Sequence, residues 1–219
     1  MKPDFNKIKG VIWDLDGTIT DTESVYRVLW LELMKDWNLP IREEFTEAIC
    51  GTSEQSAMKV IREYFPELDD PMAFRAECMH RMVVFLETQE IPLMQGAEKL
   101  IKYFDKLNKI QAIGSGNVHE TINHNLTKTN LLQYFDVIVA DGDVKCGKPA
   151  PDVFLKCSEL MELKPEETLV IEDSNSGIKA GHDAGCKTMM IPDVAPVSDE
   201  TKKIADWIYP SLLAIPGIE

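Results

Sequence analysis

The sequence predicts an α/β protein in which a parallel sheet carries an inserted helical bundle. Five short apolar runs rich in valine and isoleucine lie at residues 8–13, 110–114, 136–140, 168–171 and 187–191. Runs that are apolar at consecutive positions are typical of strands buried on both faces. Helical patterns of about 10–14 residues separate the later runs, so we expect βαβ units and a parallel sheet.

The first two predicted strands are much farther apart than one crossover requires. Nearly a hundred residues separate run 8–13 from run 110–114, whereas a βαβ unit needs about 30. A helix near residues 96–107 already supplies the crossover. We therefore expect residues 1–20 and 89–219 to form the sheet core and residues 21–88 to form a separate helical domain, with hinges near Thr20 and residues 90–92.

Apolar side chains in the inserted segment recur at intervals of three and four residues, as they do on the buried face of a helix. They are Tyr26, Leu29, Trp30, Leu33 and Trp37, and later Met79, Met82, Val83 and Leu86. The segment reads as helical throughout, with breaks at Pro66 and Pro71. We interpret the aromatic and methionine side chains as core packing rather than as a cofactor site.

Composition and charge exclude several classes of protein. Hydrophobic residues make up 44% and charged residues 27% of the chain, as in ordinary soluble domains. The net charge of −14, from 23 basic and 37 acidic residues, argues against a nucleic-acid partner. No apolar run approaches the roughly 20 residues of a membrane helix. The first residues do not resemble a signal peptide, and the five cysteines form no C-x-x-C pair, so we expect reduced thiols and a cytoplasmic location.

Polar side chains that could bind a ligand or take part in catalysis follow four of the predicted strands. They are Asp14 and Asp16; Ser115, Gly116 and Asn117; Lys148; and Glu172 and Asp173. The carboxyl ends of parallel strands share one edge of a sheet, where ligands bind. So many carboxylates are expected to need a hard cation such as Mg²⁺. With a lysine and a serine hydroxyl beside it, that cation would bind a phosphoryl group, and an aspartate can attack phosphorus.

Less specific interpretations of these residues remain open. Asp14 and Asp16 lie on one face of an ideal strand, which permits joint action but does not prove it. Ser115 could instead cap the helix that follows, and Lys148 could be a surface lysine. Glu172 could contact the metal directly or through another group. The four histidines are expected to be solvated or core residues rather than ligands.

The motifs together resemble the haloacid dehalogenase superfamily. Asp14-Leu15-Asp16-Gly17-Thr18, Ser115, Gly147-Lys148-Pro149 and Glu172-Asp173-Ser174 look like its four motifs, in the same order. The segment 171–181 is especially similar to the branch that contains β-phosphoglucomutase and small-metabolite phosphatases. The resemblance implies a Rossmann-like catalytic core with an inserted helical-bundle cap domain.

The resemblance also implies roles for individual residues. Asp14 would be the nucleophile and a Mg²⁺ ligand, and Asp16 would be the proton donor and then the base that activates water, with its backbone carbonyl on the metal. Ser115 and Lys148, with Gly116 and Asn117, would hold the phosphoryl oxygens. Asp173 and Glu172 would complete the metal site. The partner would be a small phosphorylated metabolite, and members with such caps are often monomers.

The leading hypothesis is a Mg²⁺-dependent phosphatase that acts on a sugar phosphate through an aspartyl-phosphate. Dehalogenases of the superfamily lack the second aspartate, which here is Asp16. A phosphosugar mutase is the alternative, but Tyr26 and Glu54 stand where the mutase has a histidine and an arginine, and an acid at 54 would repel a second phosphate. A phospho-signalling module or a non-catalytic binding module is the alternative from another class.

Overall fold

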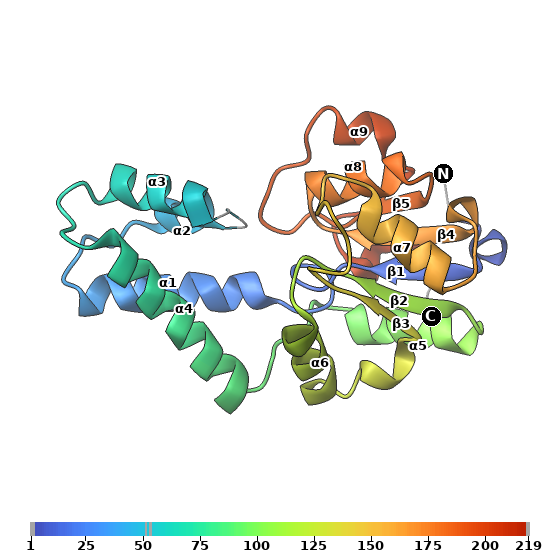
Figure 1. The fold of residues 1–219 in the computed structure, drawn as a ribbon, viewed down its shortest axis with the longest axis horizontal. Helices are drawn as coiled ribbons and strands as arrows, with labels where there is room; N and C mark the ends of the chain where they lie inside the picture. The colour runs from blue at the N-terminus through green and yellow to red at the C-terminus, as the bar shows by residue number, and fades with distance from the viewer. Residues whose placement is uncertain (1–2, 51, 53, 218–219) are drawn as a thin grey trace. The chain divides into compact units, whose positions relative to one another are not determined.

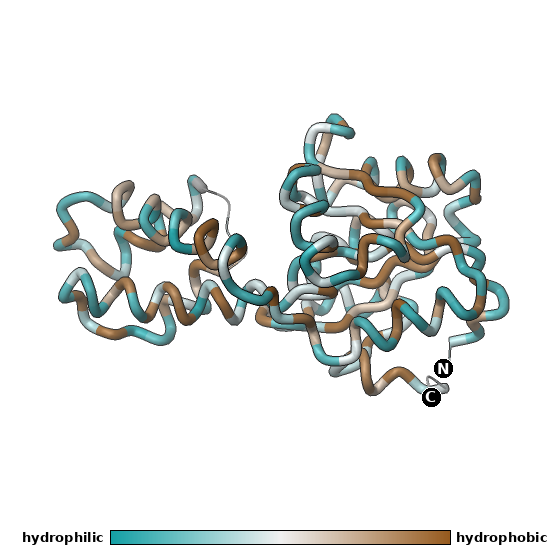
Figure 2. The backbone as a smooth tube through the Cα atoms, turned by 90° about the horizontal axis from the view of Figure 1, so that it is seen from below, coloured by the Kyte–Doolittle hydropathy of each residue, from teal (hydrophilic) through white to brown (hydrophobic). Residues whose placement is uncertain are grey.

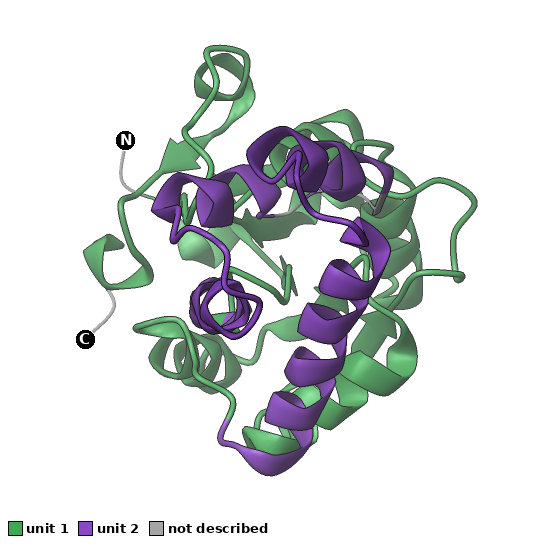
Figure 3. Cartoon of the chain, turned by 90° about the vertical axis from the view of Figure 1, so that its left-hand side faces the viewer, with its two compact units in different colours: residues 1–21, 91–219 green, residues 22–90 purple. Residues whose placement is uncertain are grey.

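The computed structural model describes residues 3–50, 52 and 54–217, with the side chain of Glu54 left out. The chain divides into two compact units, which Figure 3 shows in green and purple. Unit 1 consists of Met1–Asp21 and Ile91–Glu219, and unit 2 consists of Thr22–Glu90. The chain therefore leaves unit 1 shortly after the first strand and returns to it before the second.

Unit 1 is built on a six-stranded sheet in the order β3-β2-β1-β4-β5-β6, and all of its strand pairs are parallel (Figure 1). The strands are β1 (Gly10–Trp13), β2 (Ile110–Gly114), β3 (Val137–Val139), β4 (Thr168–Glu172), β5 (Lys187–Met190) and β6 (Trp207–Ile208). The helices are α5 (Ala97–Lys106), α6 (His119–Lys128), α7 (Asp152–Leu160), α8 (Asn175–Asp183) and α9 (Thr201–Ile204). Since β1 lies between β2 and β4, segments far apart in the sequence meet at the centre of the sheet.

The two faces of the sheet are buried under different helices. Val11 and Trp13 of β1 pack in one cluster with apolar side chains of α5 and α6, whereas Ile12 packs in another with side chains of α7 and α8. Hydrophobic stretches, brown in Figure 2, run through the middle of unit 1. Burial on both faces is the reason that the strands are apolar at consecutive positions.

Unit 2 is a bundle of helices. They are α1 (Thr22–Asp36), α2 (Glu43–Ile49), α3 (Glu54–Tyr64) and α4 (Pro71–Thr88). Trp30, Phe45, Phe65 and Phe74 pack against one another in its core, and the Phe45 and Phe65 ring centroids are 5.0 Å apart. The Phe45 ring packs edge to face against Trp30 and Phe65, and such packing stabilises a core beyond the area it buries. The predicted apolar pattern therefore serves packing, except at Val83, which is 53% exposed.

The fold class predicted from the sequence, an α/β core with an inserted helical domain, is confirmed. Two details were wrong. The inserted segment is not helical throughout, because an irregular stretch at 37–42, where no break was expected, separates α1 from α2. The break expected at Pro66 and Pro71 is present as the irregular stretch 65–70 between α3 and α4. The second of these stretches ends where Asp70 caps α4: its side chain accepts a hydrogen bond from the Ala73 N–H at 2.9 Å, and Pro71 follows as the first helical residue.

The sequence analysis also missed β6. This strand has two residues and pairs with β5 through Met189 and Met190. A strand of two residues is too short to show a periodic pattern, so it forms only because β5 offers an edge to pair with.

Within the described residues, no helix is both long and apolar enough to cross a membrane. The described residues contain no disulfide bond, and Cys78, Cys157 and Cys186 are buried. Burial raises the pKa of the Cys78 thiol to about 12, so this side chain packs as a small neutral apolar group.

Candidate active site

The residues that follow β1 and β4 meet at the carboxyl edge of the sheet. The Asp14 N–H donates to the carbonyl oxygen of Ile171 at 3.0 Å, which extends the pairing of β1 with β4 by one residue. Asp14 is thereby placed beside Glu172, the last residue of β4. In the same way the Ser115 N–H donates to the carbonyl of Val139 at 3.1 Å, just past the pairing of β2 with β3.

Lys148 joins two of these carboxylates. Its ammonium group contacts Asp14 Oδ1 and lies 2.7 Å from Glu172 Oε1. The side chains of Lys148, Asp14 and Glu172 are only 13%, 11% and 1% exposed, so this is a buried ion pair with two acids. Burial lowers the pKa of Lys148, but the charges of Asp14 and Glu172 outweigh it and raise the pKa above its ordinary value. Lys148 therefore stays charged and offsets part of the repulsion between the acids.

The carboxylate of Glu172 is held in place by the start of α8. Its Oε2 accepts hydrogen bonds from the Ser174 N–H at 2.7 Å and from the Ser174 hydroxyl at 2.8 Å. Ser174 Oγ in turn accepts from the Gly177 N–H at 3.0 Å and caps α8. A Cβ at position 177 would lie 1.8 Å from Glu172 Oε1, so only glycine leaves room for this carboxylate. Sequence reasoning gave no role to Gly177, although its spacing from Ser174 is that of a helix cap.

Asp14, Glu172 and Asp173 form a cluster that could hold a metal ion. One carboxylate oxygen from each lies within 4.8 Å of the others. Burial, opposed by Lys148 and reinforced by Glu172, raises the pKa of Asp14 to about 7. Burial and then the charges of Glu172 and Asp14 raise the pKa of Asp173 to about 9. The cluster is short of positive charge even with Lys148, and oxygen donors at this spacing suit Mg²⁺.

Asp193 is a further acid at this edge that sequence reasoning missed. A Cβ added to Gly17 would lie 2.6 Å from Asp173 Oδ2 and 3.4 Å from Asp193 Oδ2, so both carboxylates lie against Gly17, which has a φ of +76°. Asp193 Oδ2 is buried and makes no hydrogen bond to any described residue. Burial, and then the charge of Asp21, raises the pKa of Asp193. A buried carboxylate oxygen without a donor fits a site that receives a hydrated cation.

The signal for Asp193 was present in the sequence. The residue follows the apolar run 187–191 just as the other acids follow their strands. Because β5 neighbours β4 in the sheet, a carboxylate after β5 belongs at the same edge as Asp173.

Asp16 is turned toward different partners from those of Asp14. Its Oδ1 accepts from the Thr20 hydroxyl at 3.3 Å, and its Oδ2 accepts from the side-chain amide of Asn117. The strand β1 ends at Trp13, so Asp14 and Asp16 lie on the turn that follows rather than on one face of a strand. Asp16 contributes no carboxylate oxygen to the acidic cluster.

Ser115, Gly116 and Asn117 form the loop between β2 and α6. Ser115 is buried, and its Oγ accepts from the Asn117 N–H at 3.1 Å. A Cβ at Gly116 would meet no atom within 4 Å, so the backbone there borders open space. Ser115 is not the N-cap of α6, which is Val118. The structure therefore brings Asp14, Lys148, Glu172 and Asp173 together and joins Asp16 to the loop at Asn117.

The positions compared with the mutase lie in unit 2. The Tyr26 hydroxyl is 3.9 Å from the sulfur of Met79. Glu54 is the first residue of α3, and its side chain lies outside the described part of the chain, as do Gly51 and Ser53.

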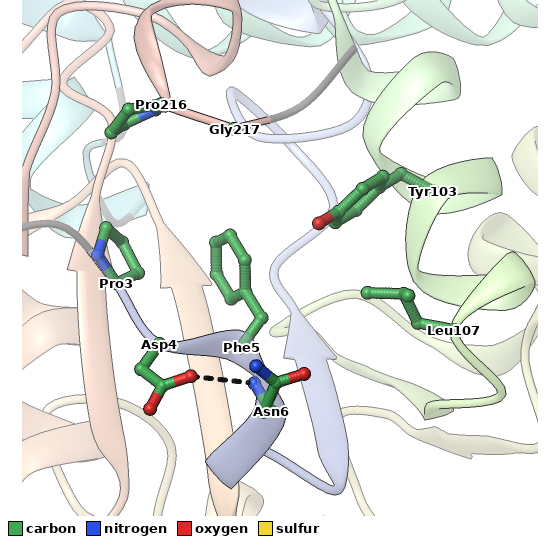
Figure 4. Close-up of a pocket in the computed structure, with 8 residues that line it drawn as sticks. All are labelled: Pro3, Asp4, Phe5, Asn6, Tyr103, Leu107, Pro216 and Gly217. Carbon is green, nitrogen blue, oxygen red and sulfur yellow. Dashed lines mark hydrogen bonds between the residues drawn. The ribbon is translucent and has the colours of Figure 1, made fainter.

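A cavity of about 420 Å³ lies elsewhere in unit 1, between residues that precede β1, the C-terminal part of α5 and residues 216–217 (Figure 4). It is lined by Pro3, Asp4, Phe5, Asn6, Tyr103, Leu107, Pro216 and Gly217, and the Phe5 ring points into it. These lining residues include one carboxylate and no lysine or arginine. The cavity is therefore unsuited to an anionic phosphate, unlike the edge that carries Lys148.

Comparison with known proteins agrees with this geometry. A family model described as haloacid dehalogenase-like hydrolase matches residues 11–191. The fructose-1-phosphate phosphatase YqaB of Escherichia coli is 31% identical over 183 residues, which are 83% of this chain and 95% of that protein. The beta-phosphoglucomutase of Bacillus subtilis is 28% identical over 185 residues, 81% of this chain and 80% of that protein.

A solved structure shows the same fold. The crystal structure of a HAD family hydrolase from Deinococcus radiodurans, with bound phosphate and sodium, has a TM-score of 0.81. It is 20% identical in sequence and covers 94% of this chain and 93% of its own.

Proposed function

Because the chain belongs to the haloacid dehalogenase-like hydrolase family, we propose that it is a Mg²⁺-dependent phosphatase of a small phosphorylated metabolite. The observation that carries the proposal is the buried group of Asp14, Lys148 and Glu172 beside Asp173. An aspartate held against a lysine can attack phosphorus, and the lysine can then neutralise the phosphoryl oxygens. We propose a sugar phosphate as the substrate class, since YqaB is named for one.

In the first step, a carboxylate oxygen of Asp14 forms a bond to phosphorus while the bond from phosphorus to the leaving oxygen breaks. Asp16 gives its proton to that leaving oxygen, which departs as an alcohol. Lys148 favours the ionised form of Asp14 before the attack, because its charge opposes the effect of burial on the Asp14 pKa. The product of this step is an aspartyl-phosphate on Asp14.

In the second step, Asp16 takes a proton from a water molecule as the water oxygen bonds to phosphorus. The bond between phosphorus and Asp14 breaks, and Asp14 returns to a carboxylate. The Ser115 hydroxyl and the backbone at Gly116 would bind the phosphoryl oxygens, and a Cβ at Gly116 would meet no atom within 4 Å, which leaves room for them. Inorganic phosphate leaves, and both aspartates regain their starting states.

The residues that would hold Mg²⁺ are Asp14 and Asp173, with the backbone carbonyl of Asp16. When bound, the ion would neutralise the phosphoryl oxygens and permit three acids to share a buried site. Glu172 accepts hydrogen bonds on both oxygens, from Lys148 and from Ser174. Its proposed role is therefore to orient Lys148 and to add negative charge near the ion.

Unit 2 is proposed to be the cap domain that selects the leaving group, with residues 21–88 as the domain and residues 1–20 and 89–219 as the catalytic core. Cysteines that form no disulfide bond among the described residues fit a reducing compartment, so the proposed location is the cytoplasm. The net charge of −14 supports a small-molecule partner rather than a nucleic acid. A monomer is the proposed state.

A phosphosugar mutase is the second candidate, favoured by the similarity to the beta-phosphoglucomutase of Bacillus subtilis. Tyr26 and Glu54 argue against it, because the mutase has a histidine and an arginine at these positions and an acid at 54 would repel a second phosphate. Incubation with β-glucose 1-phosphate and a bisphosphate primer separates the two functions. Formation of an isomerised sugar without free phosphate would identify the protein as a mutase rather than a phosphatase.

The test of the proposed function is a panel of phosphorylated metabolites, including fructose 1-phosphate, assayed for phosphate release with Mg²⁺ and again with a chelator. We expect rapid release from at least one sugar phosphate, and loss of that release with the chelator. Absence of release from the whole panel, together with a phosphoryl group that stays on Asp14, would favour a signalling module instead.

A further inference from the structure

Asn117 binds the carboxylate of Asp16 rather than facing open space. The amide nitrogen Nδ2 of Asn117 donates to Asp16 Oδ2, across 101 positions of sequence. An ionised carboxylate can only accept hydrogen bonds, so the amide must present its nitrogen to it. The loop after β2 therefore supplies a donor to the acid that follows β1.

The backbone of Asn117 is itself anchored on both sides. Its N–H donates to Ser115 Oγ at 3.1 Å, and its carbonyl accepts from the Asp141 N–H at 2.8 Å. These contacts attach Asn117 to the loop after β2 and to the loop after β3. A short side chain on a backbone held at two points keeps its amide in one place at little cost in entropy.

We propose that Asn117 is a positioning residue that decides which oxygen of Asp16 carries the catalytic proton. This inference rests on the proposed function, in which Asp16 donates and then accepts a proton. An N–H group facing Oδ2 disfavours a proton on that oxygen, because two hydrogens would then meet. The proton is confined to Oδ1, where the Thr20 hydroxyl can turn to donate to the Leu15 carbonyl at 3.2 Å and accept from Asp16.

The consequence for the reaction is that Oδ1 is the oxygen that exchanges protons in both steps. In the first step, the O–H bond at Oδ1 breaks as a new O–H bond forms on the leaving oxygen. In the second step, Oδ1 takes a proton from the attacking water. With the Asn117 amide absent, the Asp16 carboxyl could rotate and place its proton on either oxygen, and fewer encounters would be productive.

This role differs from the phosphate-binding role that the sequence suggests for Asn117. If the Asn117 amide bound phosphate, its removal would slow the reaction of every phosphate ester equally. A residue that positions the proton donor would matter most when the leaving oxygen needs a proton, as in alkyl esters, and little for p-nitrophenyl phosphate, whose leaving group departs as a stable anion.

The experiment compares Asn117→Ala with Asn123→Ala, which removes an exposed amide of α6 that donates to the His119 carbonyl at 2.8 Å. Single-turnover rates of phosphoenzyme formation are measured with p-nitrophenyl phosphate and with the alkyl phosphate that the wild type hydrolyses fastest. Inhibition by inorganic phosphate is measured in parallel, and thermal unfolding checks that each variant is folded.

We expect Asn117→Ala to slow phosphoenzyme formation from the alkyl phosphate by about 100-fold, within the 10²–10⁴-fold range of general acid catalysis. Its rate with p-nitrophenyl phosphate should fall less than about 5-fold, and phosphate inhibition should not change. Asn123→Ala should match the wild type. An equal loss for both substrates with weaker phosphate inhibition, or no loss for either, would overturn the inference. A wild type that forms no phosphoenzyme with any ester would instead reject the proposed function.

Discussion

The molecule contains two buried clusters of opposite character. In unit 1 the cluster is charged and consists of Asp14, Lys148, Glu172 and Asp173. In unit 2 the cluster is aromatic and consists of Trp30, Phe45, Phe65 and Phe74. Burial of aromatic rings stabilises a fold, whereas burial of charges costs free energy that pairing only partly returns. We infer that the aromatic cluster serves stability and that the charged cluster is retained for chemistry.

The largest expected effect comes from Asp14→Asn in the charged cluster. Loss of the nucleophile should reduce turnover of p-nitrophenyl phosphate by about 10⁴-fold or more. The free energy of unfolding should fall by less than about 1 kcal/mol, or rise, because the change removes a buried charge but keeps the shape. Asp105→Asn, on the exposed surface of α5, is the control. Retained turnover would remove Asp14 from the role of nucleophile.

Lys148→Ala tests whether one residue of the charged cluster serves both stability and chemistry. Two acids would be left buried without their cation, so we expect a loss of about 3–5 kcal/mol in unfolding free energy. Turnover should also fall by about 10²–10³-fold, since a charge on the phosphoryl oxygens is lost. Lys145→Ala changes an exposed lysine in the same loop and should affect neither quantity. Denaturant titrations measure the unfolding free energy, and steady-state assays measure turnover. A loss of only one of these two quantities would show that Lys148 does not serve both stability and chemistry.

Phe74→Ala tests the aromatic cluster. The side chain is fully buried, and its removal should lower the stability of unit 2 by about 3–5 kcal/mol. Hydrogen exchange of the backbone amides of residues 22–90 reports this loss directly. Val83→Ala, at a side chain 53% exposed on α4, should change stability by less than about 0.5 kcal/mol. Similar results for the two variants would mean that the aromatic cluster does not carry the stability of its unit.

Asp193→Asn tests whether the metal site of the charged cluster includes Asp193. We expect about a 10-fold weaker affinity for Mg²⁺, because the acid beside Asp173 loses its charge but keeps its shape. Calorimetric titration of the protein with Mg²⁺ measures this without any assay of activity. Asp199→Asn, at an exposed acid on the following segment, is the control. An unchanged affinity would exclude Asp193 from the metal site.

The smallest effect is the dependence of stability on pH in the presence of a chelator. The pKa of Asp14 is raised to about 7 and that of Asp173 to about 9, so the folded chain binds protons that the unfolded chain releases near pH 4. This contribution is complete below about pH 4 and is lost as pH rises through 7 and 9, by on the order of 1 kcal/mol or more. Asp173→Asn should reduce the slope, which chemical denaturation at several pH values would measure.

Much of the fold was accessible from local patterns. The five predicted strands overlap β1 to β5, and the run 110–114 coincides with β2. The helix near residues 96–107 matches α5 (Ala97–Lys106) to within a residue. These predictions succeed because burial on both faces requires apolar side chains at consecutive positions, which can be read without knowing the neighbours. The strand β6 could not be predicted in this way, because two residues are too few to show a pattern.

The sequence by itself determined that β1 to β5 and α5 form and that acids follow β1 and β4. Only the tertiary structure decided the partners: Lys148 with Asp14 and Glu172, Asn117 with Asp16, and Asp193 beside Asp173. The physical reason is that hydrophobic periodicity records burial, a property of one segment. A hydrogen bond instead depends on the order of strands in the sheet, which places residues more than a hundred positions apart within a few ångströms.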